Sequence, residues 1–306
     1  MTADLTKPEF TNEAAAIAFM EADRWPNGVT CPLCGVDTVH KMGGLTQAGM
    51  FVCNGCHGKF TVRTGTVFER SHIPLHKWLL AMHLMSSSKK GISAHQLHRM
   101  LGITYKSAWF MAHRIREAMA PTATAPKIGG KNKVVEADET VLSRSRKTRI
   151  GHGYKKNIAV LSLVERGGRI LSFPLAGEPS RDEILPALFG HVDPKSILHT
   201  DGAQYYKFNR ATAEHESVDH NKQYVRKGKK GRKVHTNTAE GYFSIFKRGM
   251  VGTYQHCGEQ HLHRYLAEFD FRASNRAAFG VNDEMRAERI LKGAEGKRLT
   301  YRQTAH

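Results

Sequence analysis

The 306-residue sequence has few cysteines, far fewer acidic than basic residues, and no long apolar run. Five cysteines are too few for a disulfide scaffold, and no apolar stretch approaches the roughly 18–20 residues of a membrane span. The first residues carry acidic side chains and no basic stretch, so they do not read as a secretory signal. These absences predict a cytoplasmic protein with no membrane partner.

The charge is strongly unbalanced. Lysine and arginine number 46 against 28 aspartate and glutamate residues, which gives a formal net charge of +18. An excess of this size favours a polyanionic partner, and nucleic acid is the first expectation. It argues against an ordinary enzyme of small metabolites.

Four of the five cysteines form two pairs with the pattern Cys31-x2-Cys34-x18-Cys53-x2-Cys56. Zinc prefers four thiolate ligands in a tetrahedron, and this spacing is typical of a zinc ribbon. Four cysteines leave no position for substrate, so the predicted zinc ion is structural. The alternative is a set of redox pairs or unrelated buried thiols. The unpaired Cys257 is predicted to be a small core residue.

Residues 93–119 fit two helices around a short turn. Ser93 and Thr104 suit the N-caps of the two helices, and Gly102 suits the turn. In a DNA-binding helix-turn-helix, the second helix would contact nucleic acid through polar and basic side chains. The candidates there are Tyr105, Lys106, Ser107 and Arg114. The alternative is a helical hairpin that packs only on the core.

After a linker at 121–132, the sequence becomes rich in β-branched residues. Short runs at 133–137, 157–165, 169–176 and 196–200 predict strands, with a helix at 181–190 before the last of them. This order predicts an α/β domain with a mixed sheet.

Acidic residues end two of these strands. Asp138 follows the first strand and Asp201 follows the fourth. If the two strands are neighbours, their carboxylates converge and, with a third acid, can hold two Mg²⁺ ions about 3.5–4 Å apart for attack on a phosphodiester. The alternative is that each is an ordinary turn residue. Several nearby acids compete for the same role: Glu136, Glu139, Glu214, Glu216 and Asp219.

Glu240 is the best candidate for the third acid. A helix capped by Asn237 or Thr238 would place it in the first turn. Lys247 follows nearly two turns later on the same face and could hold a phosphate. The alternative is a solvated glutamate–lysine face.

A basic segment at 222–233 is a further candidate for phosphate contact. Its alternative is a flexible solvated insertion. The seven basic residues are Lys222, Arg226, Lys227, Lys229, Lys230, Arg232 and Lys233.

Several motifs occur in a fixed order: CPLC and CNGC, then FTVRTGTVFERSHIPLHKW, VEADET, HTDGAQYY and VHTNTAEGYFSIFKRGMVGTY. In this order the chain resembles the DDE transposases of bacterial insertion sequences with an N-terminal zinc ribbon, group fifteen ninety-five. The resemblance implies a ribonuclease-H-like catalytic domain with a triad of Asp138, Asp201 and Glu240 that binds Mg²⁺ or Mn²⁺. It also implies that Lys247 is the basic residue that follows the last acid, while the role of Asn237 in the active site stays open.

The resemblance further implies cleavage at the inverted-repeat ends of an element and strand transfer into target DNA. The expected partners are element ends and target DNA, with a homodimer or larger synaptic complex in the nucleoid. Two alternatives remain: a non-catalytic DNA-binding regulator built from the same modules, and a nuclease of similar fold without strand transfer. The predicted parts are an N-terminal helix (1–30), zinc ribbon (31–70), helix-turn-helix region (72–120), linker (121–132), catalytic domain (133–280) and charged tail (281–306).

Overall fold

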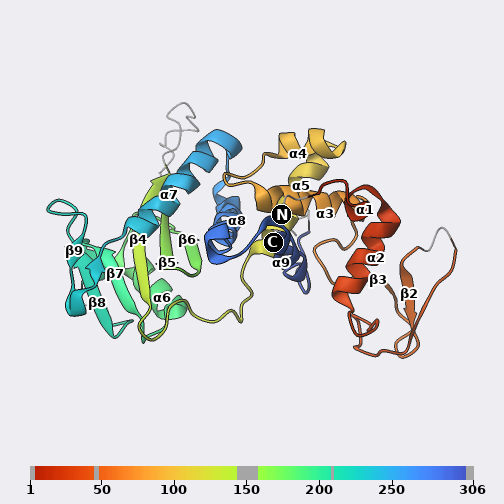
Figure 1. Ribbon diagram of the computed structural model, residues 1–306, viewed down its shortest axis with the longest axis horizontal. Helices are drawn as coiled ribbons and strands as arrows, with labels where there is room; N and C mark the ends of the chain where they lie inside the picture. The colour runs from red at the N-terminus through yellow and green to blue at the C-terminus, as the bar shows by residue number, and fades with distance from the viewer. Residues whose placement is uncertain (1–3, 45–47, 143–157, 208–209, 301–306) are drawn as a thin grey trace. The chain divides into compact units, whose positions relative to one another are not determined.

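The computed structural model describes residues 4–44, 48–142, 158–207 and 210–300. The chain forms two compact units (Figure 1). The first contains residues 1–120 together with 281–306, and the second contains residues 121–280. Within the described ranges, no helix combines the length and apolar character needed to cross a bilayer.

The first unit begins with two helices and a small sheet. Helix α1 spans Pro8–Thr11, and α2 spans Glu13–Arg24, where a helix was predicted. The antiparallel sheet has the order β1-β2-β3, with strands Val39–Lys41, Met50–Cys53 and Lys59–Thr61. The rings of Phe51 and Phe60 stack with centroids 5.5 Å apart inside this sheet's core. So small a core needs a further source of stability.

Four helices complete this unit: α3 (Leu75–Ser87), α4 (Ala94–Leu101), α5 (Tyr105–Met119) and α9 (Asp283–Lys292). Helix α9 lies in the segment predicted to be a charged tail. It packs against α3 and α5 and buries Ile290 and Leu291. The backbone continues this contact, because Val67 N donates to the carbonyl of Ala294 at 3.1 Å. The two ends of the chain therefore build one unit.

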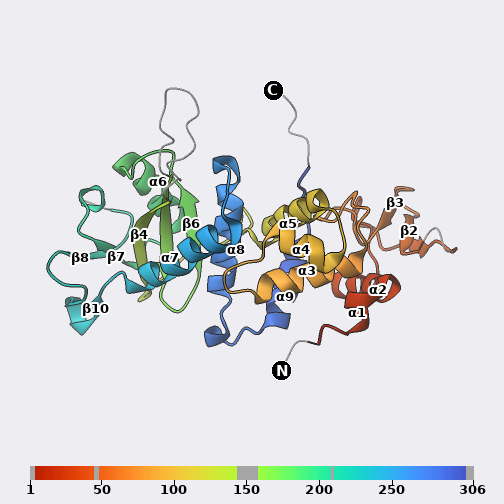
Figure 2. The ribbon, with the colours of Figure 1, turned by 90° about the horizontal axis from the view of Figure 1, so that it is seen from above.

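The second unit confirms the predicted mixed α/β sheet (Figure 2). Its order is β6-β5-β4-β7-β8; β4, β5 and β6 are antiparallel, whereas β7 and β8 run parallel to β4. The strands are β4 (Val134–Leu142), β5 (Ile158–Glu165), β6 (Ile170–Pro174), β7 (Ile197–Asp201) and β8 (Glu214–Val218). A small hairpin follows, formed by β9 (Arg226–Lys227) and β10 (Lys233–Val234).

Helices cover both faces of the sheet. Helix α6 (Arg181–His191) packs on one face through Ile184 and Leu188. Helices α7 (Asn237–Gly249) and α8 (Leu262–Ser274) pack on the other. Two details differ from expectation. Strand β4 does not end at Asp138, because pairing with β5 continues to Leu142. Strand β8 was not predicted, because its sequence EHESV lacks an apolar pattern.

Candidate functional site

The four paired cysteines meet at one point. The sulfur atoms of a tetrahedral zinc site with Zn–S bonds of about 2.3 Å lie about 3.8 Å apart. Here the sulfurs of Cys31 and Cys56 are 3.8 Å apart, and those of Cys34 and Cys53 are 3.5 Å apart. Among the described residues, this is the one group of three or more metal-ligating side chains whose ligand atoms all lie within 4.8 Å. The donor set and its spacing fit a structural zinc ion.

Tight backbone turns hold the two cysteine pairs. Gly35 N donates to the carbonyl of Cys31 at 2.8 Å, and His57 N donates to that of Cys53 at 2.9 Å. Gly35 has a φ of 80°, in the left-handed region that favours glycine. In the second turn the left-handed residue is His57, with a φ of 56°. Each turn curls the backbone around its sulfurs.

The register of the larger sheet sets the first two acids side by side. Strands β4 and β7 are parallel neighbours, with Glu136 opposite His199. Asp138 and Asp201 each stand two residues beyond this last pair, and the charge of Asp201 acts on Asp138. Asp138 also pairs with Ser162 of β5. The residues two positions before and after Ser162, Val160 and Val164, pack under α7 and α8. Both candidate acids therefore lie on the face that carries Glu240.

Asp138 lies within electrostatic reach of both Asp201 and Glu240. Burial, together with the negative charges of Glu139, Asp201 and Glu240, raises the pKa of Asp138 to about 8. Crowded carboxylates repel one another, and a bound divalent cation relieves that repulsion. The carboxylate oxygens of Asp138, Asp201 and Glu240 do not all lie within 4.8 Å of one another, whereas the four cysteine sulfurs do. The acids thus form an open group rather than a closed cage.

Glu139 lies on the opposite face of the sheet. It pairs with Leu161, whose side chain belongs to the core under α6. The hydroxyl of Tyr205 donates to its carboxylate at 2.8 Å, and the hydroxyl of Tyr206 donates to the other oxygen. Burial raises the pKa of Glu139 to about 7. Its carboxylate is held by the two tyrosine hydroxyls, while its charge still acts on Asp138.

Glu136 has a structural role that sequence reasoning left open. It is fully buried on β4, and one carboxylate oxygen accepts hydrogen bonds from Thr238 N at 2.9 Å and Ala239 N at 3.0 Å. These are orphan N–H groups of the first turn of α7. The expectation that Asn237 or Thr238 caps this helix is therefore wrong. The N-cap is Thr236, which makes no side-chain cap bond, and Glu136 supplies the acceptor instead.

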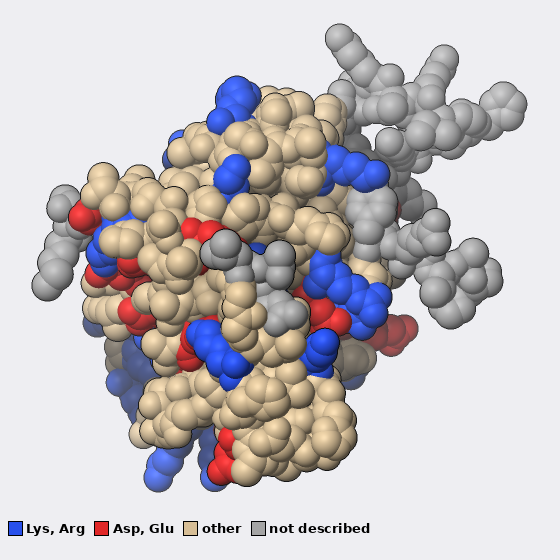
Figure 3. All heavy atoms as spheres, turned by 90° about the vertical axis from the view of Figure 1, so that its right-hand side faces the viewer, with Lys and Arg blue, Asp and Glu red and all other residues tan. Residues whose placement is uncertain are grey.

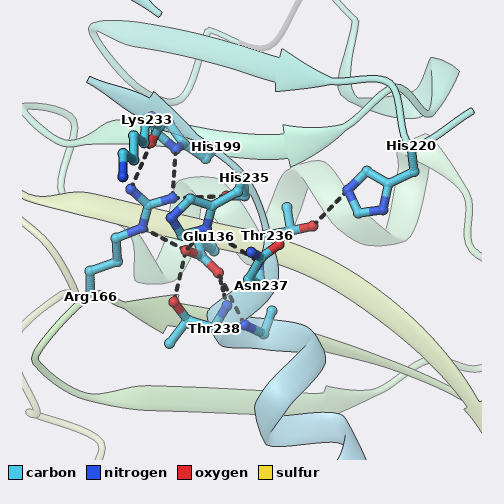
Figure 4. A network of polar contacts seen from close by, with 10 residues as sticks. Glu136, Arg166, His199, His220, Lys233, His235, Thr236, Asn237 and Thr238 are labelled. Atoms are coloured by element: carbon cyan, nitrogen blue, oxygen red, sulfur yellow. Dashed lines mark hydrogen bonds and ion pairs between the residues drawn. The ribbon is translucent and has the colours of Figure 1, made fainter. Parts of the chain in front are cut away.

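Arg166 ties this cap to the neighbouring strands (Figure 4). Its Nε donates to Glu136 at 2.6 Å, and its two Nη groups donate to the carbonyls of Lys233 at 3.0 Å and His235 at 2.9 Å. It also lies 3.1 Å from Nδ1 of His199. Burial and the charge of Arg166 lower the pKa of His199 to about 3, so this imidazole is neutral. The network fixes the start of α7 against β4 and β7.

Glu240 is exposed in the first turn of α7, as predicted. Its Oε1 lies 3.2 Å from Nδ1 of His220, and Nε2 of that imidazole lies 3.1 Å from the hydroxyl of Thr236. Sequence reasoning did not single out His220, because it stands in a polar stretch without a motif. Lys247 is exposed, and so is Asn237, the first residue of α7.

Helices α4 and α5 have the predicted caps. The hydroxyl of Ser93 accepts from Gln96 N at 3.1 Å, that of Thr104 accepts from Ser107 N at 3.2 Å, and Gly102 has a φ of 59°. Tyr105 and Lys106 are exposed in the first turn of α5, and Ser107 is half-buried.

Arg114 does not fit the predicted contact with nucleic acid. It is buried, and its Nη1 donates to the carbonyls of Val67 at 2.9 Å and Glu69 at 3.0 Å. The guanidinium therefore holds the segment that follows β3 against α5. Most residues in the second half of α5 are buried, and Arg114 is one of them.

The basic segment 222–233 divides into two groups. Arg226 and Arg232 form ion pairs with Glu216 and Glu214 of β8, and Lys222 and Lys230 lie within 4 Å of Asp219 and Glu214. The other three are exposed and, within the described part of the chain, form no ion pair: Lys227, Lys229 and Lys233. The arginines hold the segment on β8, and the lysines face solvent.

Charge is also partly paired in the first unit. Figure 3 shows acidic side chains among the basic ones on one face of the molecule. Lys41 lies 2.8 Å from Glu21, and Arg63 lies 3.0 Å from Glu13. The net positive charge is therefore distributed rather than gathered in one patch on this face.

Comparisons with known proteins match both regions of the chain in which these sites lie. Residues 128–274 match the family model of the ISXO2-like transposase domain, and residues 11–59 match that of the transposase zinc-ribbon domain. A protein of Halobacterium salinarum, named as an uncharacterized protein in transposable element ISH50, is 27% identical over 282 residues. That alignment covers 86% of this chain and 91% of the relative. Residues 128–274 therefore belong to the family of ISXO2-like transposase domains, and residues 11–59 belong to that of transposase zinc ribbons.

Proposed function

We propose that this protein is a DNA transposase that binds the inverted-repeat ends of an insertion sequence, cleaves them and transfers the freed strand into target DNA. The observation that carries the proposal is the open group of Asp138, Asp201 and Glu240 on one face of the sheet. Burial and the charges of neighbouring carboxylates raise the pKa of Asp138. Such a group is suited to divalent cations.

These three acids would hold Mg²⁺ or Mn²⁺, which would activate the attacking hydroxyl and stabilise the leaving oxygen. Glu136 and Arg166 position the first turn of α7 and thereby Glu240. Lys247, exposed on the same helix, would bind a phosphate of the DNA. The strand order β6-β5-β4-β7-β8 supports a ribonuclease-H-like catalytic domain at 133–280.

End recognition would fall to the zinc ribbon and to a helix-turn-helix formed by α4 and α5. Tyr105, Lys106 and Ser107 stand at the N-terminal end of α5, where a recognition helix reaches bases and phosphates. Lys227, Lys229 and Lys233 would add phosphate contacts from the second unit. The reaction joins two ends, so we propose a homodimer or larger complex.

A joining assay tests this function. The wild-type protein is mixed with the DNA that flanks its own gene, a supercoiled plasmid and Mg²⁺, beside Asp201→Asn and the exposed control Asp182→Asn on α6. We expect joined products from the wild type and the control, and end binding without cleavage from Asp201→Asn. Cleavage by Asp201→Asn would show that the triad is wrong. Cleavage without joining would favour a nuclease, and binding without cleavage by the wild type would favour a regulator.

A further inference from the structure

One exposed aromatic side chain lies next to the candidate acids. Tyr224 precedes β9 and is 66% exposed. Its ring packs edge-on against His220, with centroids 5.5 Å apart and an interplanar angle of 61°. His220 in turn contacts the carboxylate of Glu240 at 3.2 Å. A single imidazole therefore separates Tyr224 from one of the three acids.

Packing does not account for this tyrosine. A side chain exposed to this extent contributes little to a core, and the following residue, Val225, is 41% exposed as well. The contact with His220 is T-shaped, and most of the phenol side chain stays exposed to solvent beside it. Three of the basic residues around it are exposed: Lys222, Lys227 and Lys229. Aromatic rings on a positively charged surface are the usual stacking platforms for unpaired bases.

We propose that Tyr224 stacks on an unpaired base of the DNA beside the position of strand cleavage. This inference rests on the proposed function and deepens it, because it names a single-stranded nucleotide as part of the substrate. Bases inside a duplex are already stacked on one another, so an exposed ring can stack only on a base that has left the duplex or ends it. Stacking there would stabilise strand separation at the point where a phosphodiester must reach the half-buried Asp138.

The test compares two DNA probes in buffer that contains neither Mg²⁺ nor Mn²⁺ and no chelator, so that no strand is cut and the zinc ribbon keeps its metal. One is a blunt duplex, and the other is the same duplex with a short single-stranded extension carrying 2-aminopurine. We expect the wild type to bind the extended duplex roughly 10-fold more tightly and to quench the 2-aminopurine fluorescence. Tyr224→Ala should lose both effects, whereas Tyr224→Phe should keep them.

A matched control is Phe189→Ala, which removes another exposed ring of the same unit, on α6. It should behave as the wild type. If Tyr224→Ala retains both the preference and the quenching, the stacking site is wrong. If the wild type binds both duplexes equally, the stacking site alone is overturned. If it binds neither duplex, the proposed function itself fails, and this inference fails with it.

Discussion

The cysteine cluster and the acid group are two candidate metal centres of opposite construction. The four sulfurs come from one short stretch of chain, and local turns bring them to the spacing of a tetrahedron. The three acids come from β4, β7 and α7, remain more widely spaced, and repel one another. A closed set of ligands stabilises a fold, whereas an open one leaves positions for substrate at a cost in stability.

The two centres also differ in what holds them. The ribbon core contains little beyond two stacked phenylalanines and their neighbours, so the metal would supply much of its stability. The acid group is held by a sheet and by the buried cap of Glu136 on α7. Removing metal should therefore unfold the zinc ribbon but leave the acid group folded, with its carboxylates repelling one another.

The largest effect is expected when zinc is removed or Cys53 is replaced by serine. The binding free energy of a structural zinc ion is also folding free energy. We expect end binding to fall by more than about 100-fold, while the second unit keeps its melting transition. Binding and calorimetry on the metal-depleted protein measure this, and Cys257→Ser is the matched control. Equal loss of both units would show that the ribbon supports the whole chain.

Glu136→Gln should cause the next largest change. The amide would leave Arg166 without its buried carboxylate partner and weaken the cap on α7. We expect the free energy of unfolding of the second unit to fall by about 3 kcal/mol, and cleavage to weaken because Glu240 is displaced. Denaturant unfolding measures the first effect. Glu214→Gln, which breaks more exposed ion pairs, should change stability far less; equal losses would contradict the cap.

Asp138→Asn should have the smallest effect on stability and the opposite sign. With a pKa of about 8, the carboxyl of Asp138 must take up a proton on folding at neutral pH, and asparagine removes that cost. In metal-free buffer at neutral pH, we expect the free energy of unfolding to rise by about 1–2 kcal/mol while cleavage is lost. Mg²⁺ should raise the melting temperature of the wild type but not of this variant. A destabilised variant would show that Asp138 serves the fold.

The sequence predicted the local features well. Cysteine spacing, the caps at Ser93 and Thr104, and the left-handed Gly102 each depend on a few consecutive residues. Features that depend on distant partners were missed. Strand β8 is polar because it lies at the sheet edge beside the basic segment, and it becomes a strand only by pairing with β7.

The same distinction applies to individual side chains. Glu136 was one acid among several in the sequence, because its partners on α7 are about a hundred residues away. Arg114 looked like a DNA contact because its carbonyl partners, Val67 and Glu69, cannot be inferred from helical spacing. Basic residues that fasten backbone and basic residues that face solvent look alike until the fold is known.

The joining of both chain ends in one unit sets an order of synthesis. Lys297 donates to the carbonyl of Glu117 at 2.9 Å, at the end of α5, and Gly296 N donates to that of Gly65 at 2.9 Å. A ribosome makes the ribbon and α3 to α5 first, then all of residues 121–280, and only afterwards the segment that closes the first unit. The second unit is therefore complete before the first, and a chain interrupted after residue 280 would carry the acids without the closed first unit.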